Sequence, residues 1–163
     1  MSETLAIPSG AVDVLARETR SYGVRLLETG GFLFTETDHT TQRGVALAGT
    51  RGIVRRRRLF QISARALDRL FTFADDRGLW IPVQFHSHEM SAVMSETDDA
   101  HGLRAEGFVS AIIPSFAAPP ADVSRWGWWQ FQHGGWHQRA PITVHPAAVD
   151  LVVTFDEDGV RES

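Results

Sequence analysis

Cysteine is absent from the 163-residue sequence, and its absence excludes disulfides, thiolate metal sites and cysteine nucleophiles. Any metal ion would therefore be held by imidazole and carboxylate side chains. Lysine is absent as well, so all 16 cationic side chains are arginines. A GC-rich genome is the simplest explanation of this bias, but the protein also offers no lysine amine to a modifying enzyme.

Long apolar runs and a large charge imbalance are also lacking. No segment approaches the roughly 18 apolar residues that a membrane span requires. The N-terminal segment MSETLAIPSGAVDV has no basic region followed by an apolar run, so we do not expect it to be a signal peptide. The formal net charge of −4 does not favour general nucleic-acid binding. We therefore expect a cytoplasmic protein that binds neither membranes nor nucleic acids.

Helix and strand patterns alternate along the chain. Apolar residues at three- and four-residue steps predict a helix capped by Ser9 and another capped by Ser63, with Gly78 beyond the end of the second. A third, short helix is predicted from Ser95 to about Leu103. Strands are predicted for YGVRLLETGGFLFTE, GVALAG, LWIPVQFHSH, GFVSAIIP and VDLVVTF, and a hairpin for RWGWWQFQHGGWHQRAP.

This alternation predicts a mixed α/β (α+β) protein in which one layer of helix packs against a β-sheet. At 163 residues, the simplest organisation is a single domain that spans residues 1–163. The polar segment 156–163 follows the last predicted strand, and we expect it to be a flexible tail.

The densest group of chemically active side chains lies in VQFHSHEMSAVMSETDD. Residues two apart on a strand point to the same face, so His86 and His88 can aim both imidazoles at one point. Ser95 is a good N-cap, which places Asp98 in the first turn of the following helix, from where its carboxylate can reach back towards the strand. Two imidazoles and one carboxylate suit a zinc ion with one coordination position left for water.

A second carboxylate, Glu28, is predicted at the centre of an otherwise apolar strand, next to Gly30 and Gly31. A glutamate in that setting is costly unless it is paired or used. If its strand neighbours the strand of His86 and His88, the carboxylate can take a proton from a water molecule at the metal and then return it. A surface position at the strand edge is the alternative.

The segments ETGGFLF, HSH and SETD, in this order, resemble the JAMM motif of the JAB/MPN metalloproteases. The resemblance implies a cytidine-deaminase-like fold of three layers, with a mixed β-sheet flanked by helices. It implies that His86, His88 and Asp98 bind Zn²⁺, that Glu28 is the general acid/base, and that Ser95 stabilises the oxyanion. The family hydrolyses the peptide or isopeptide bond after the C-terminal glycine of ubiquitin or ubiquitin-like modifiers.

The sequence departs from the family pattern at two places. Six residues separate His88 from Ser95, where seven are usual, and Glu89 stands where proline is usual. The shorter loop leaves Asp99 as an alternative metal ligand. We favour Asp98 because it keeps the Ser-x-x-Asp spacing.

The resemblance also implies partners. Bacterial members of the family accompany ubiquitin-like proteins and activating enzymes in sulfur transfer, modifier processing and defence against phages. We therefore expect a ubiquitin-like protein or its conjugate as the substrate, and E1- or E2-like enzymes of the same operon as further partners. The alternatives are a non-catalytic MPN scaffold and a peptidase that trims a sulfur-carrier protein. A nucleobase deaminase is excluded because its zinc site needs cysteine.

Two further features have structural explanations as well as functional ones. The run Arg55–Arg58 is typical of a solvated hairpin edge, although it could contact an acidic face of a modifier. In the tryptophan-rich hairpin, alternation places Trp126 and Trp128 on one face and Trp129 and Phe131 on the other. Core packing is the default for such a group, and one face could be exposed for a partner.

Overall fold

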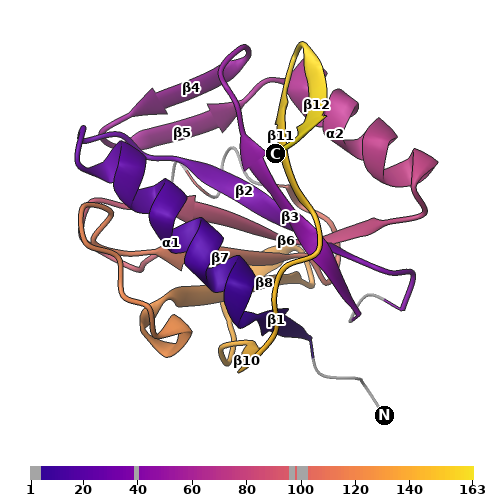
Figure 1. Ribbon diagram of the computed structural model, residues 1–163. Helices are drawn as coiled ribbons and strands as arrows, with labels where there is room; N and C mark the ends of the chain where they lie inside the picture. The colour runs from indigo at the N-terminus through magenta and orange to yellow at the C-terminus, as the bar shows by residue number, and fades with distance from the viewer. Residues whose placement is uncertain (1–4, 39–40, 96–97, 99–102) are drawn as a thin grey trace.

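An eight-stranded mixed sheet forms the centre of the computed structural model, which describes residues 5–38, 41–95, 98 and 103–163 (Figure 1). The strand order is β12-β11-β3-β2-β6-β7-β8-β9. These strands are β2 (Gly30–Thr35), β3 (Gln42–Ala48), β6 (Trp80–Ser87), β7 (Val109–Ile113), β8 (Gly127–Gln132), β9 (Gly135–Gln138), β11 (Val152–Asp156) and β12 (Gly159–Glu162). The β3–β11 and β6–β7 pairs are parallel, and the other neighbours are antiparallel.

Two short strand pairs lie outside this sheet. β1 (Ala6–Pro8) pairs in parallel with β10 (Thr143–His145), so the N-terminal segment lies beside a segment from late in the sequence. β4 (Ile53–Arg56) and β5 (Leu59–Ile62) form a hairpin whose turn consists of Arg57 and Arg58. The predicted location of the arginine run in a hairpin is therefore confirmed.

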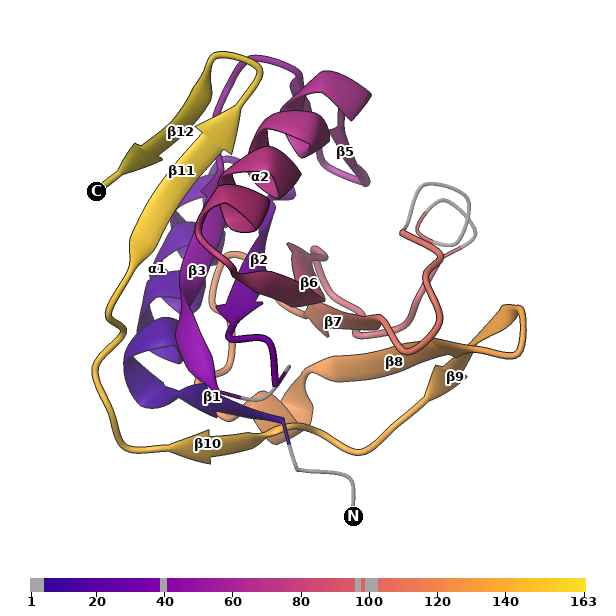
Figure 2. The same cartoon turned by 90° about the vertical axis from the view of Figure 1, so that its right-hand side faces the viewer.

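The sheet lies between two helices, one on each face (Figure 2). α1 (Ser9–Gly23) shares one buried cluster with Leu33 of β2, whereas α2 (Ala64–Asp76) shares the other with Phe32 and Phe34 of the same strand. All six residues of β2 are buried, as expected for a central strand that is covered on both sides. The three-layer arrangement that the resemblance implies is confirmed, and the prediction of a single helix layer is wrong.

The two helices begin differently. Ser63 caps α2 as predicted, because its hydroxyl accepts a hydrogen bond of 3.1 Å from the backbone N–H of Ala66. Pro8, and not Ser9, occupies the N-cap position of α1. The Ser9 hydroxyl donates instead to the carbonyl of Ala147, which ties the start of α1 to the segment after β10.

The predicted strand YGVRLLETGGFLFTE is wrong in its first half. α1 continues through Gly23, a turn follows in which Leu26 has a positive φ of 60°, and β2 begins only at Gly30. A side chain at position 23 would meet the carbonyl oxygen of Phe116 at 2.0 Å, so only glycine fits this close approach. Glu28 therefore lies in the loop that enters β2, not at the centre of a strand.

The segment 156–163, expected to be a flexible tail, is an ordered part of the sheet. β12 pairs with β11 from Gly159 to Glu162 in antiparallel register. The Arg161 guanidinium contacts the Asp156 carboxylate at 2.8 Å and 3.1 Å, and this hydrogen bonding lowers the pKa of Asp156 to about 2. Backbone pairing and this ion pair hold the segment although it has few apolar side chains.

The tryptophan-rich hairpin turns at His133 and Gly134, which both have positive φ. Trp126 and Trp128 are buried and stacked with ring centroids 6.0 Å apart, whereas Phe131 contacts Trp136. The predicted alternation of faces is confirmed. The helix predicted from Ser95 to Leu103 falls largely outside the described residues. Among the described residues, no helix is long and apolar enough to cross a membrane.

Candidate metal centre

The two histidines lie at the end of strand β6, in the middle of the sheet. This strand lies between β2 and β7, and His86 pairs in register with Gly30 on one side and Ile112 on the other. A side chain at position 30 would meet the carbonyl oxygen of Phe85 at 2.3 Å and the Phe60 ring at 2.6 Å. Glycine at this position therefore lets the start of β2 approach β6 closely, next to the histidines.

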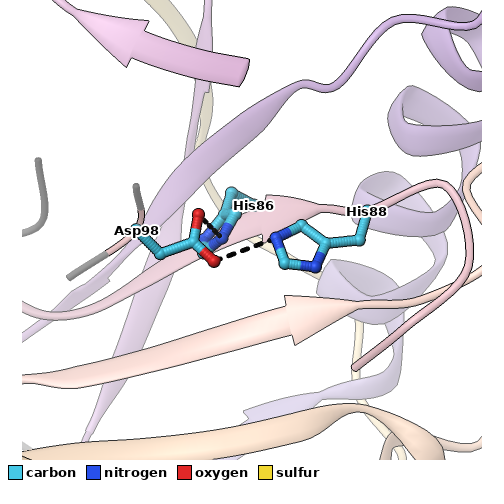
Figure 3. Close-up of side chains that lie close together, drawn as sticks. All are labelled: His86, His88 and Asp98. Atoms are coloured by element: carbon cyan, nitrogen blue, oxygen red, sulfur yellow. Dashed lines mark ion pairs between the residues drawn. The ribbon is translucent and has the colours of Figure 1, made fainter. Parts of the chain in front are cut away.

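The structure brings His86, His88 and Asp98 together (Figure 3). His86 Nε2 lies 3.0 Å from Asp98 Oδ1, and His88 Nε2 lies 3.0 Å from Asp98 Oδ2. One potential ligand atom from each residue lies within 4.8 Å of the others. The predicted convergence of these three side chains is confirmed in the geometry, and the alternative ligand Asp99 lies outside the described residues.

This cluster fits a divalent metal ion. The contact between His86 Nε2 and Asp98 lacks hydrogen-bond geometry, so this buried ring nitrogen has no hydrogen-bond partner among the described residues. A buried nitrogen without a partner is costly unless it coordinates a ligand. Two imidazoles and one carboxylate form a donor set typical of a metal site that leaves a coordination position open.

Hydrogen bonds around the cluster fix the orientation of two of the three side chains. His88 Nδ1 lies 3.1 Å from the carbonyl oxygen of Ser91, an arrangement that turns Nε2 towards Asp98. Ser95 and Asp98 form a reciprocal capping box. The Ser95 N–H donates to Asp98 Oδ2 at 2.8 Å, and the Asp98 N–H donates to Ser95 Oγ at 3.1 Å. The predicted capping role of Ser95 is confirmed.

Glu28 lines the same cavity as His88 and Ser95, a space of about 250 Å³. Only 5% of Glu28 is exposed, and burial raises its pKa to about 8, with opposing contributions from His88, which lowers it, and Asp98, which raises it. Burial also raises the pKa of Asp98, but the contacts with His86 and His88 outweigh it and hold that pKa well below its usual range. The site therefore contains one ionised carboxylate and one that is close to its titration point at neutral pH.

Three residues that hold the loop of Glu28, namely Ser87, Arg55 and Arg56, were not predicted to do so. Ser87, between the two histidines, is fully buried and forms three hydrogen bonds with Thr29. The Thr29 N–H donates to Ser87 Oγ at 2.9 Å, and the Thr29 carbonyl accepts from the Ser87 N–H at 2.9 Å and from the Ser87 hydroxyl at 3.3 Å. On the other side, Arg55 Nε donates to Thr29 Oγ1 at 3.1 Å, and the Arg56 carbonyl accepts from the Glu28 N–H at 2.9 Å. The serine of His-Ser-His is the one sequence signal for this arrangement.

Replacing Ser87 with alanine is expected to leave the metal ligands intact but to disturb the loop that carries Glu28. The buried Thr29 N–H loses its acceptor, which should lower the free energy of unfolding by about 1–3 kcal/mol. Misplacement of Glu28 should lower kcat on the order of tenfold. Chemical denaturation, metal content and kcat measure the three quantities. Ser110→Ala, at a buried serine of β7 outside the metal centre, is the control, and an equal loss of kcat in both variants would contradict a positioning role.

Comparison with known proteins agrees with this geometry. No family model matches the sequence. Among curated proteins, the chain is similar to the probable metalloprotease y4jG of Sinorhizobium fredii, with 29% identity over 74% of this chain and 77% of that protein.

Solved structures share the fold at low sequence identity. The solution structure of protein DSY2949 from Desulfitobacterium hafniense matches with a TM-score of 0.64 and 14% identity, covering 88% of this chain and 94% of that one. The crystal structure of AF2198, a JAB1/MPN domain protein from Archaeoglobus fulgidus, matches with a TM-score of 0.51 and 15% identity, covering 88% and 99%. The fold shared with a JAB1/MPN domain protein, the similarity to a probable metalloprotease and the motif residues assembled in one site together support a relationship to the JAB/MPN metalloproteases.

Proposed function

We propose that the protein is a zinc-dependent peptidase or isopeptidase that cleaves after the C-terminal glycine of a ubiquitin-like modifier. The observation that carries the proposal is the placement of a buried carboxylate, Glu28, in one cavity with His88, a member of the three-residue metal cluster. A scaffold protein has no need of this costly arrangement, because nothing in it requires a proton acceptor.

Each residue of the site has its own role in peptide hydrolysis. A zinc ion held by His86, His88 and Asp98 would supply a Lewis acid that polarises the scissile carbonyl and lowers the pKa of water. Glu28 takes one proton from the attacking water and passes it to the leaving nitrogen as the C–N bond breaks, which yields a carboxylic acid and an amine. Burial raises the pKa of Glu28 in the metal-free protein, which brings its titration towards neutral pH, and a group that titrates near the working pH accepts and releases protons readily.

Ser95 is assigned to the oxyanion. Its oxygen accepts the hydrogen bond from the Asp98 N–H, so the hydroxyl proton stays available as a donor. Donated to the oxygen of the tetrahedral intermediate, this proton stabilises the charge that develops during attack.

A groove next to the site fits an extended peptide. It has a volume of about 480 Å³ and is lined by Phe60, Gln61 and Ile62 of β5 and by Gln84, two residues before His86 on β6. Phe60, Ile62 and Leu67 make much of its wall apolar. We assign this groove to the modifier's C-terminal tail, which would run along the β5 strand as peptides do at strand edges. Activity in the cytoplasm, alongside E1- or E2-like enzymes of the same operon, is part of the same proposal.

The test uses a ubiquitin-like protein encoded beside the gene, fused through its C-terminal glycine to a small reporter. We expect the zinc-loaded enzyme to release the reporter, with mass spectrometry placing the cut after the glycine. A chelator should abolish cleavage and added zinc should restore it. Cleavage that persists in the chelator, or none by the zinc-loaded enzyme, contradicts the proposal.

Two other outcomes separate the alternatives. A folded protein that retains no zinc would favour a non-catalytic scaffold. Cleavage of a short C-terminal extension, without cleavage of an isopeptide-linked conjugate, would favour trimming of a sulfur-carrier precursor.

A further inference from the structure

The four consecutive arginines of the β4–β5 hairpin have different environments. Among the described residues, Arg58 alone of the four both lines the candidate active-site cavity and makes no hydrogen bond or ion pair. Arg55 is half-buried and structural: it donates to the carbonyls of Ala48 and Gly49, and its guanidinium lies 4.0 Å from the centre of the Tyr22 ring. Arg56 is exposed and does not line the cavity. The expectation of a uniformly solvated hairpin edge is therefore wrong for Arg55.

The two turn residues, Arg57 and Arg58, both line the cavity that contains Glu28, His88 and Ser95. Arg57 is neutralised by Glu89, in a two-point contact of its Nε at 2.5 Å and its Nη2 at 2.7 Å. This pair joins the hairpin turn to the loop after the second histidine.

Arg58 has no hydrogen bond or ion pair with any of the described residues. The charge of Arg58 also acts on Glu89, but Arg57 already holds that carboxylate in direct contact. A guanidinium without a direct carboxylate contact, at the wall of a small cavity, is a ready site for an anion. The cavity of about 250 Å³ is smaller than the roughly 300–1,000 Å³ of whole small-molecule sites, so it suits one side chain or one chain end.

We propose that Arg58 determines specificity by binding a substrate carboxylate next to the scissile bond, on the side of the leaving amine. The inference rests on the proposed function, in which glycine occupies the other side of the bond and brings no charge. The carboxylate then belongs either to an aspartate or glutamate side chain or to the free α-carboxylate of a C-terminal residue. In both cases the guanidinium holds the leaving group in place while Glu28 transfers the proton to its nitrogen.

The test measures binding of fluorescein-labelled peptides to the zinc-loaded Glu28→Gln variant, so that no probe is consumed. Three probes end in Gly-Gly-Ala-amide, Gly-Gly-Asp-amide and Gly-Gly-Ala with a free carboxylate. Fluorescence anisotropy at about 50 mM salt should show a preference of roughly fivefold for one or both carboxylate probes over the neutral amide. The aspartate probe and the free-acid probe separate the two sources of the carboxylate.

Substitutions in this background assign the preference. Arg58→Gln should bring the ratio of affinities close to one, and Arg58→Glu should invert it. Arg56→Gln removes a neighbouring charge outside the cavity and is the matched control. It should leave the ratio of affinities unchanged. Glu89→Gln should increase the ratio of affinities, because Arg57 is then released from Glu89 and can also attract the carboxylate. The preference should also weaken in about 0.5 M salt, which a purely structural role of Arg58 would not produce.

Equal binding of all three probes, or an unchanged ratio in Arg58→Gln, overturns the inference. Because the ratio compares probes within one variant, a general loss of folding lowers both affinities and leaves it unaltered. Chelator-sensitive cleavage of the neutral peptide by the wild-type enzyme, with no carboxylate preference, would leave the proposed function intact and reject the role of Arg58. A preference that depends on Arg58, without cleavage of any peptide, would reject the hydrolase and keep the anion site.

Discussion

Replacing Glu28 with glutamine is expected to lower kcat by about 10²–10⁴-fold while the protein keeps its zinc. Glutamine preserves the shape of the side chain but cannot carry the proton from water to the leaving nitrogen. Because Glu28 is not a member of the His86, His88 and Asp98 cluster, the metal content should stay at the wild-type level. Single-turnover cleavage of the reporter fusion and elemental analysis check the two parts. Full activity in this variant would eliminate Glu28 as the proton carrier.

The same substitution should stabilise the metal-free protein at alkaline pH. The pKa of Glu28 is raised from 4.5 to about 8 in the folded protein, so ionisation penalises the folded state as the pH rises above 4.5, up to about 8. Glutamine removes that penalty, and we expect about 1–3 kcal/mol at pH 8 and little difference at pH 4. Thermal unfolding after chelation should show a Tm increase on the order of 5 °C at pH 8. A difference that does not vary with pH would contradict the assigned pKa.

Replacing His88 with alanine is expected to abolish both zinc binding and turnover. The variant loses one of three ligands and also the Nδ1 contact with Ser91 that orients it. Changes to groups that merely support a ligand already weaken metal binding by about 10–100-fold, so removal of a ligand should exceed this range. Competition with a chromophoric chelator measures the affinity, and His145→Ala, at an exposed histidine of β10, is the control.

Thermal unfolding provides an independent check of the His88 variant. Zinc binds the folded protein, so it should raise the Tm of wild type and of His145→Ala but not that of His88→Ala. If His88→Ala binds zinc as tightly as wild type, the ligand assignment is wrong. The comparison of Tm values needs no substrate, so it stands even if the natural modifier is not the one tested.

The sequence was informative where short spacings decide geometry. His86 and His88 share a face because the strand repeat is two residues, and the capping box places Asp98 one turn from Ser95. These features need only local information. The metal cluster could therefore be predicted, and so could the capped start of α2 at Ser63.

Prediction failed where long-range contacts decide the local structure. Val24 and Leu26 suggested a strand by their apolar character, but both are exposed, in the turn that follows α1. The position of Glu28 depends on the Arg56 carbonyl and on Ser87, which come from distant segments. The polar composition of β12 likewise concealed a strand, because its backbone pairs with β11 and needs few apolar side chains.

The parallel pairing of β1 with β10 and of β3 with β11 has a consequence for biosynthesis. Ser9 bonds to Ala147, 138 positions along the chain, and Thr50 to Asp156, 106 positions along it. Contacts of such sequence separation form late in folding, because the intervening polymer must first be brought together. We therefore expect β1 and β3 to remain without these partners until the segment that contains β10 and β11 has been synthesised.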